Sequence, residues 1–515
     1  MTTLTPAART RLFWACFIAL VTTAFAFMLR VQLMGQWELE FGLDKTQAGT
    51  IMGAGFWPFG VSIVLFSLVL DRVGYGAAMA FAIGSFIAFA LLSIFATGFT
   101  MLYWASILGG LGAGAVEAVI NPLIADVYKD NKTKWLNILH AGWPGGLVIT
   151  GIVVLGIGDA MSWQWKIGLI LIPAVVSGIM MMGVTFPTSS RVLAGVSYRE
   201  MLAQVGWGGA FIVSLMVVME LTTNVLGIAV LQPLWAQVAI AAVIAAAFGA
   251  YARSFGRPIF VFLLVVMLAL ATTELGTDAW VKDLLAPALN SAMGIDSGWV
   301  LVYTAAIMMV LRFSCGPLIG ALKPLGVLAV SAAVVTVGIW WLAILADDFA
   351  VGAIAILLAA TIYGIGQTFF WPTTLGFVSE QFPKGGPMTL NLIAGVGMLG
   401  VGVLGDPWLG NVQDTRVVAA LQSANPVIAA EYVTDEKPSL FGSYASLTPE
   451  AADARDEHAA AIAAAERTGK GEALAAVSIL PIFMFVSYLG LIAYYRSRGG
   501  YRPVELEGVP TSKSM

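Results

Sequence analysis

The amino-acid sequence predicts an all-α, polytopic membrane protein with about 14 transmembrane helices. Composition is the first observation: 59% of the 515 residues are hydrophobic and 11% are charged, with a mean hydropathy of +0.88. A soluble domain carries about 25% charged residues. The second observation is a series of apolar runs long enough to cross a bilayer. The third is the placement of Lys and Arg, which gather in alternate connecting segments.

The apolar runs fall into groups of six, two and six along the chain. They lie at about 12–35, 47–70, 77–97, 101–127, 138–158, 165–186, 205–226, 233–252, 258–281, 298–321, 325–346, 351–378, 387–410 and 473–495. The first run is long and lacks a cleavage site of the A-x-A kind, so we expect it to remain as an anchor.

The basic residues predict the orientation. If the N-terminus is cytoplasmic, the segments on that side hold sixteen Lys and Arg residues, and the short outer loops hold three, Lys45, Lys166 and Lys282. This asymmetry is the one that the positive-inside rule requires, and it favours an even number of spans. The sequence therefore predicts a multi-pass cell-membrane protein with both termini cytoplasmic, in the inner membrane if the source is Gram-negative.

We divide the chain into an N-terminal six-helix bundle (1–190), an inserted two-helix segment with linkers (191–256) and a C-terminal bundle (257–515). The inserted helices are apolar, so we expect them outside the bundles, lining no cavity. Residues 411–472 form a polar outer loop in which Thr448 begins a short surface helix. Tight turns at 70–76 and 316–326 occupy matching places in the two bundles, and such symmetry is typical of a transporter.

One stretch in the fourth run carries the strongest functional signal. Glu117 lies near the middle of a spanning helix, where a carboxylate costs roughly 2–3 kcal/mol. Asn121 follows one helical turn later on the same face. Pro122 frees a backbone carbonyl close to the carboxylate. Glu117 is therefore a functional site or one half of a structural ion pair.

Several motifs resemble those of the major facilitator superfamily. The turn Asp71-Arg72-x-Gly74 resembles the superfamily signature, in which the Asp and Arg influence switching between conformations. The segment Glu117-x-x-x-Asn121-Pro122, with His140 and Gly145-Gly146 after it, is similar to the fourth and fifth helices of the fucose permease-like (fucose–galactose–hexose) sugar:proton symporters. Arg312-Phe313-Ser314 and Phe370-Trp371-Pro372 resemble the eighth and tenth helices of that family, and Glu274 resembles an acid in the seventh.

The resemblance implies two six-helix bundles and proton-coupled sugar transport with alternating access. It also implies that Asp71, Arg72 and Arg312 act in conformational gating. The chain departs from the family in placing Arg30 where an acid is common, and in its two extra helices.

Each bundle holds one buried acid and one buried base, and paired charges offset the cost of desolvation. We expect Arg30 to face the central cavity within reach of Glu117, and Glu274 to meet Arg312. Both pairs are either purely structural or a switch that proton or substrate opens. Proton coupling is assigned to Glu117, Glu274 and Asp278. Asp278 lies one turn from Glu274, and their repulsion favours a proton on one of them, unless Asp278 pairs with Lys282.

Substrate contacts are expected from polar and aromatic side chains near the midplane. The candidates are Arg30, Gln32, Glu117, Asn121, Asn137, Trp143, Gln367, Trp371 and Asn391. His140 is interpreted as an ordinary helix-end residue, Asp406 as a solvated one and Glu220 as structural.

The prediction is thus a secondary transporter, not an enzyme, that carries a monosaccharide with a proton, or with sodium. The alternatives are an organic anion or sugar-acid transporter that uses Arg30, and a non-transporting membrane sensor. No nucleotide-binding motif, cofactor, metal site or nucleic-acid contact is predicted, and Cys16 and Cys315 are expected to be buried and free. We expect a monomer in the lipid bilayer.

Overall fold

The computed structural model describes residues 4–43, 45–277, 298–346, 353–437, 439–448, 450–451 and 454–507. Thirteen helices of this part of the chain are long and apolar enough to cross a membrane. A shorter apolar helix, Leu301–Phe313, coincides with the tenth predicted run, so all fourteen runs have a helical counterpart. No β-strand is formed by the described residues, which carry only two isolated bridges. The all-α, polytopic prediction is confirmed.

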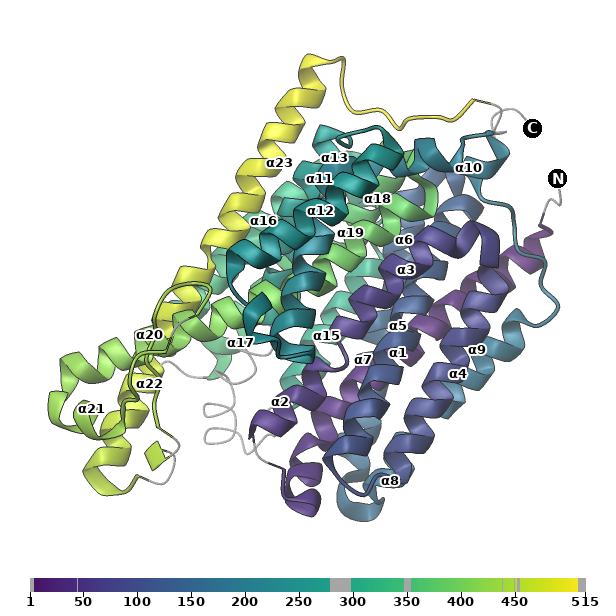
Figure 1. The fold of residues 1–515 in the computed structure, drawn as a ribbon. Coiled ribbons are helices and arrows are strands. Elements are labelled where there is room, and N and C mark those ends of the chain that lie inside the picture. The colour runs from purple at the N-terminus through teal and green to yellow at the C-terminus, as the bar shows by residue number, and fades with distance from the viewer. Residues whose placement is uncertain are drawn as a thin grey trace.

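The N-terminal half supplies the purple to blue helices of Figure 1. Its helices are α1 (Pro6–Phe41), α2 (Lys45–Gly53), α3 (Trp57–Val73), α4 (Tyr75–Ile94), α5 (Phe99–Val127), α6 (Lys132–His140), α7 (Gly142–Ile157), α8 (Trp163–Gly168), α9 (Leu171–Met181) and the short α10 (Ser190–Leu193). Helix α5 is central, since it packs on α1, α3, α4 and α6. Its glycines permit this: a Cβ on Gly114 would collide with the backbone of Phe59.

The inserted pair follows as α11 (Tyr198–Glu220) and α12 (Leu234–Ala252). Gly206 interrupts α11 with a positive φ of 57°, and there Trp207 N–H donates to Ser254 O (2.9 Å). A Cβ on Gly206 would collide with Gly256, so this join requires glycine. Helix α12 packs chiefly on α11, while α11 also contacts α13 and α19.

The C-terminal half contains α13 (Pro258–Ala271), α15 (Gly298–Phe313), α16 (Gly316–Ala346), α17 (Ala353–Gln367), α18 (Phe370–Gln381), α19 (Gly386–Gly400), α20 (Asp406–Ala424), α21 (Pro426–Tyr432), α22 (Asp456–Val477) and α23 (Ile479–Ser497). Two π-helical turns, Thr272–Gly276 after α13 and Val401–Gly405 after α19, contact each other. The predicted turn at 316–326 is present, as a kink at Lys323 (φ 59°) ahead of Pro324.

The predicted outer loop is helical at both ends, and the described residues between 433 and 455 are mostly irregular. Helix α20 continues the preceding span to Ala424, and α22 runs into α23, so the segment is a helical extension, at the lower left of Figure 1. Its own small core includes Leu421, Ile428 and Ile462. The surface helix expected in the Ala-rich sequence after Thr448 is present as α22, but its regular part begins later, at Asp456, and runs to Val477.

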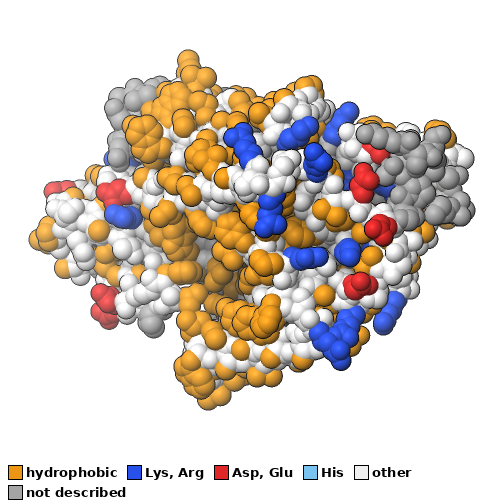
Figure 2. Space-filling model, turned by 90° about the horizontal axis from the view of Figure 1, so that it is seen from above, with side chains coloured by type: hydrophobic (Ala, Val, Ile, Leu, Met, Phe, Trp, Pro, Cys, Tyr) orange, Lys and Arg blue, Asp and Glu red, His pale blue; other side chains and the backbone are white. Residues whose placement is uncertain are grey.

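The first and last described residues, 4 and 507, lie on the same side of the molecule, at the upper right of Figure 1. Figure 2 looks onto that side and shows Lys and Arg side chains gathered over its middle and right, next to a broad area of hydrophobic side chains. We refer to this side as the terminal face. Its assignment to the cytoplasm stays a prediction from the positive-inside rule.

Candidate substrate cavity and terminal-face seam

A central cavity of about 360 Å³ lies between the two halves of the molecule. Each half contributes nine of its lining residues. They are Phe27, Val31, Met52, Phe56, Phe59, Glu117, His140, Trp143 and Leu147 from the first, and Glu274, Leu275, Gly276, Leu301, Arg312, Trp371, Met398, Val401 and Asp406 from the second. Twelve side chains are aliphatic, aromatic or Met, and five are titratable. This is the composition of a small-molecule site, with few polar groups on an apolar wall.

Glu117 heads a chain of hydrogen bonds in the cavity wall. Asn121 Nδ2 donates to Glu117 Oε2 (2.6 Å), as the i,i+4 spacing predicts. His140 Nε2 lies 2.9 Å from Asn121 Oδ1 and 4.0 Å from Glu117 Oε2. His140 is a helix-end residue, as expected, since α6 ends there, but it is not an ordinary one, because its side chain is buried and lines the cavity.

Arg312 joins this chain to the other half. Its Nη2 donates to Glu274 Oε1 (3.1 Å), its Nη1 to the backbone oxygen of His140 (2.8 Å) and its Nε to Thr368 O (2.7 Å). The predicted pair of Glu274 and Arg312 is therefore confirmed. A guanidinium presents donors in several directions. Arg312 therefore links Glu274, in the π-helical turn after α13, to the backbone of His140, which lies beside Glu117.

Arg30 does not pair with Glu117, and that prediction was wrong for this conformation. Its guanidinium lies against Gly55, Gly109 and the Phe89 ring (5.9 Å to the centroid), and Arg30 is absent from the cavity lining. Gly109 precedes Glu117 by eight residues, about 12 Å along α5. Arg30 Nε and Nη1 are buried and receive no hydrogen-bond partner from the described residues.

The other predicted substrate residues divide into two groups. Trp143 and Trp371 line the cavity, whereas Gln32 and the buried Gln367 do not. Asn137 and Asn391 bridge the two halves: Asn137 Nδ2 donates to Thr373 Oγ1 (3.2 Å), and Asn391 Nδ2 donates to Ala118 O (2.9 Å). Asp278 and Lys282 lie outside the described residues.

Asp406 is exposed at the start of α20, in agreement with the expectation of a solvated helix-end residue, and it also lines the cavity. Helical spacing along the sequence does not indicate this position, because a π-helical turn stands immediately before it. Glu220 lies in α11 and does not line the cavity. No lining residue comes from α11 or α12.

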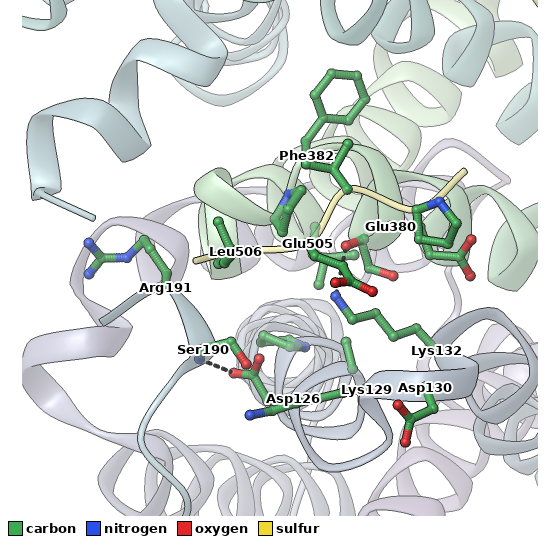
Figure 3. A pocket seen from close by; sticks show the side chains of 18 residues that line it. Asp126, Lys129, Asp130, Lys132, Ser190, Arg191, Glu380, Phe382, Glu505 and Leu506 are labelled. Atoms are coloured by element: carbon green, nitrogen blue, oxygen red, sulfur yellow. Dashed lines mark hydrogen bonds between the residues drawn. The ribbon is translucent and has the colours of Figure 1, made fainter. Parts of the chain in front are cut away.

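A second cavity, of about 350 Å³, lies at the terminal face where the two halves meet (Figure 3). We call this place the terminal-face seam, lined by Asp126, Lys132, Ser190, Glu380 and Val504 among others. Thr133 Oγ1 donates to Glu380 Oε1 (2.5 Å), and Lys132 Nζ donates to Ser379 O (3.0 Å), so both contacts cross from one half to the other.

The C-terminal tail lies on this seam. Tyr501 Oη donates to Glu380 Oε2 (2.6 Å), and Val504 N–H donates to Glu380 O (2.8 Å). Gln381 Nε2 donates to Arg502 O (2.8 Å). Burial beside the Glu380 carboxylate raises the pKa of the Tyr501 phenol, which keeps its proton for this bond.

The signature turn after α3 contacts the linker. Arg191 Nη2 and Nε donate to Asp71 Oδ2 (2.5 and 3.1 Å), and the Arg72 guanidinium lies 5.1 Å from the centroid of the Tyr198 ring. Asp71 and Arg72 thus attach the first half to the segment that leads into α11.

The family model of the Major Facilitator Superfamily matches residues 12–405. Among curated proteins, the probable 4-methylmuconolactone transporter of Cupriavidus pinatubonensis is 26% identical over 176 residues, 32% of this chain and 40% of that protein. The hexuronate transporter of Bacillus subtilis is 28% identical over 148 residues, 27% of this chain and 34% of that protein. The matches thus span well under half the length of each relative.

Solved structures resemble the fold over nearly its whole length. The proton:xylose symporter XylE, bound to 6-bromo-6-deoxy-D-glucose, superposes with a TM-score of 0.59 at 12% identity, covering 94% of this chain and 96% of that one. The fucose:proton symporter FucP of E. coli gives a TM-score of 0.52 at 14% identity, with 92% and 98% covered. These likenesses concern the fold.

Proposed function

Because this chain belongs to the Major Facilitator Superfamily, a family of transporters rather than enzymes, we propose that it carries a small uncharged solute together with a proton. A monosaccharide is the solute that we favour. A cavity of about 360 Å³ with Trp143 and Trp371 in its wall suits a ring that has one apolar face. Glu117 and His140 supply polar contacts for hydroxyl groups.

The observation that carries this proposal is the chain Glu117–Asn121–His140, which Arg312 connects to Glu274 in the other half. A proton on Glu117 removes a negative charge from the cavity wall close to Arg312. Solute bound there competes for the same donors, so solute and proton affinity are linked. Protonation of Glu117 or binding of solute at the floor of the cavity therefore changes contacts in both halves. Alternating access requires such a link between the halves.

The test is uptake into proteoliposomes under an imposed pH gradient. A neutral pentose or hexose should accumulate when the gradient is present and only equilibrate when an ionophore dissipates it. Replacement of sodium by choline at constant pH gradient distinguishes the proton from sodium as the coupling ion. Failure of every neutral sugar to enter, with the purified protein folded, would contradict the proposal.

A second candidate is transport of an organic anion, and two sequence relatives favour it, because they are named for hexuronate and 4-methylmuconolactone. The geometry of the central cavity supports anion transport less than it supports transport of a neutral sugar. Arg312 is the only Lys or Arg among the described residues that line the cavity, and its guanidinium already donates to Glu274, His140 and Thr368. Competition between a hexose and the corresponding hexuronate in the same vesicles separates the two candidates.

The gating roles of Asp71, Arg72 and Arg312 belong to the same proposal. Asp71 and Arg72 hold the linker through Arg191 and Tyr198, and Arg312 holds the cavity floor. We further propose a monomer in the cell membrane with the terminal face in the cytoplasm. Labelling of cysteines placed at 500 and at 165 with an impermeant reagent in intact cells tests that orientation.

A further inference from the structure

Asp406 occupies the end of the cavity farthest from the terminal face. It is the first residue of α20 and follows the π-helical turn Val401–Gly405. Gly386, in the lining of the terminal-face seam, precedes it by twenty residues, which is about 30 Å of helix. The carboxylate lies against the other π-helical turn, because a Cβ on Gly276 would stand 3.2 Å from Asp406 Oδ1. Asp406 therefore marks the mouth of the cavity.

The three carboxylates of the cavity have different surroundings. Glu117 receives a hydrogen bond from Asn121, Glu274 pairs with Arg312, and the side chains of both are about 7% exposed. Asp406 is exposed although it lines the cavity, and none of the described residues gives it a hydrogen bond or an ion pair. Its charge is therefore directed into the water of the cavity mouth.

The balance of charge follows from these contacts. The charges of Arg312 and Glu274, 3.1 Å apart, cancel each other. A neutral His140 ring adds no charge. The described lining then carries the negative charges of Glu117, toward the floor, and Asp406, at the mouth. Low-dielectric walls focus such a field within a cleft. Its reach is about 8 Å at physiological salt, comparable with the size of a small solute.

We propose that Asp406 determines specificity by charge, favouring neutral and cationic solutes over anions at the cavity mouth. This inference rests on the proposed transport of an uncharged solute, and it names the residue that disfavours acids. A sugar acid meets the Asp406 carboxylate before it reaches Arg312, whereas the neutral sugar pays no such electrostatic cost.

Charge selectivity can be measured without knowing the substrate. Leu275 lines the cavity next to Gly276, so Leu275→Cys places a thiol close to the Asp406 carboxylate. Cys16 and Cys315, both free and buried, are replaced by alanine to remove background. The reporter is then modified with a cationic and with an anionic methanethiosulfonate of similar size, and the ratio of the two rates is compared between variants.

Asp406→Asn should lower the ratio of cationic to anionic rate by about fivefold or more, since it acts on the two reagents in opposite directions. Asp406→Ser should do the same, and both replacements suit a helix start. Asp406→Glu should keep the ratio. The matched control is Asp414→Asn, which removes the same charge from α20 eight residues on, outside the cavity lining, and should leave the ratio unchanged.

An unchanged ratio in both neutral variants, or an equal fall with Asp414→Asn, would overturn the proposal. Transport provides the second readout: Asp406→Asn should raise uptake of a hexuronate relative to the hexose. If the wild type carries neither compound, the proposed function fails, and the labelling ratio still decides the role of Asp406.

Discussion

Arg312 and Glu274 form a buried ion pair, with Nη2 and Oε1 3.1 Å apart and both side chains at most 7% exposed. The same guanidinium donates to His140 O, so one residue links two helices of the second half to the first. Breaking a buried pair by removing one partner leaves an uncompensated charge, whereas an exposed pair contributes little.

Arg312→Met should therefore lower the free energy of unfolding by about 3–5 kcal/mol and abolish uptake. Arg416→Met is the matched control, because Arg416 and Glu472 form an ion pair of 3.3 Å whose side chains are about half exposed. Its effect should stay within about 1 kcal/mol. Thermal unfolding in detergent compares the two variants. Equal losses of stability would show that the buried pair contributes no more than the exposed one.

Glu117→Gln keeps the size of the side chain and can still meet Asn121, but it cannot titrate. Exchange of labelled for unlabelled solute should persist at a rate within about tenfold of the wild type, and accumulation driven by a pH gradient should be lost. Exchange and net uptake are measured in the same vesicles. A Gln variant that accumulates solute as well as the wild type would move proton coupling to Glu274 or to Asp278.

Gly55→Ala should disturb the place where Arg30 is held, since a Cβ on Gly55 collides with the guanidinium. Overpacking of this kind costs about 1–3 kcal/mol. Gly53→Ala, two residues earlier, meets open space and should be neutral or slightly stabilising. Melting temperatures of the two variants test this, and equal stability would mean that Arg30 moves aside without cost.

Tyr501→Phe removes the hydroxyl that binds Glu380 and should weaken closure of the terminal-face seam. Loss of a hydrogen bond to a charged group is worth about 1.5–3 kcal/mol, so opening should increase about tenfold or more. A Leu390→Cys reporter in the lining of the seam measures opening by its labelling rate. Tyr494→Phe, in the exposed part of α23, is the control and should change nothing.

Hydropathy predicted the spanning helices because burial in lipid or in protein demands the same apolar composition over a fixed length. The pairing of Glu274 with Arg312 was also predictable, since both charges lie in spanning helices and each requires a partner. Hydropathy does not predict the direction in which a side chain points from its helix. Arg30 lies in the same bundle as Glu117, yet it faces Gly55 and Gly109 in another layer, and only the packing of the helices determines this.

The direction of the Asp406 side chain is also difficult to predict from the sequence. A π-helical turn adds one residue, and an extra residue rotates everything after it by about 100° about the helix axis. The turn Val401–Gly405 stands immediately before Asp406, and nothing in its Val-Gly-Val-Leu-Gly sequence distinguishes it from an ordinary helix. An assignment by helical spacing from α19 therefore places the carboxylate on the wrong face.

The helical extension of α20, α21 and α22 has a practical consequence for experimental imaging. A transporter that is almost entirely enclosed by a detergent micelle offers few features by which particle images can be aligned. Here α20 continues directly from the π-helical turn beside the cavity, and α22 packs on both α20 and α16. The extension is thus an asymmetric marker joined to the second half of the molecule. A binding antibody fragment raised against it would report the rotation of that half in each captured state.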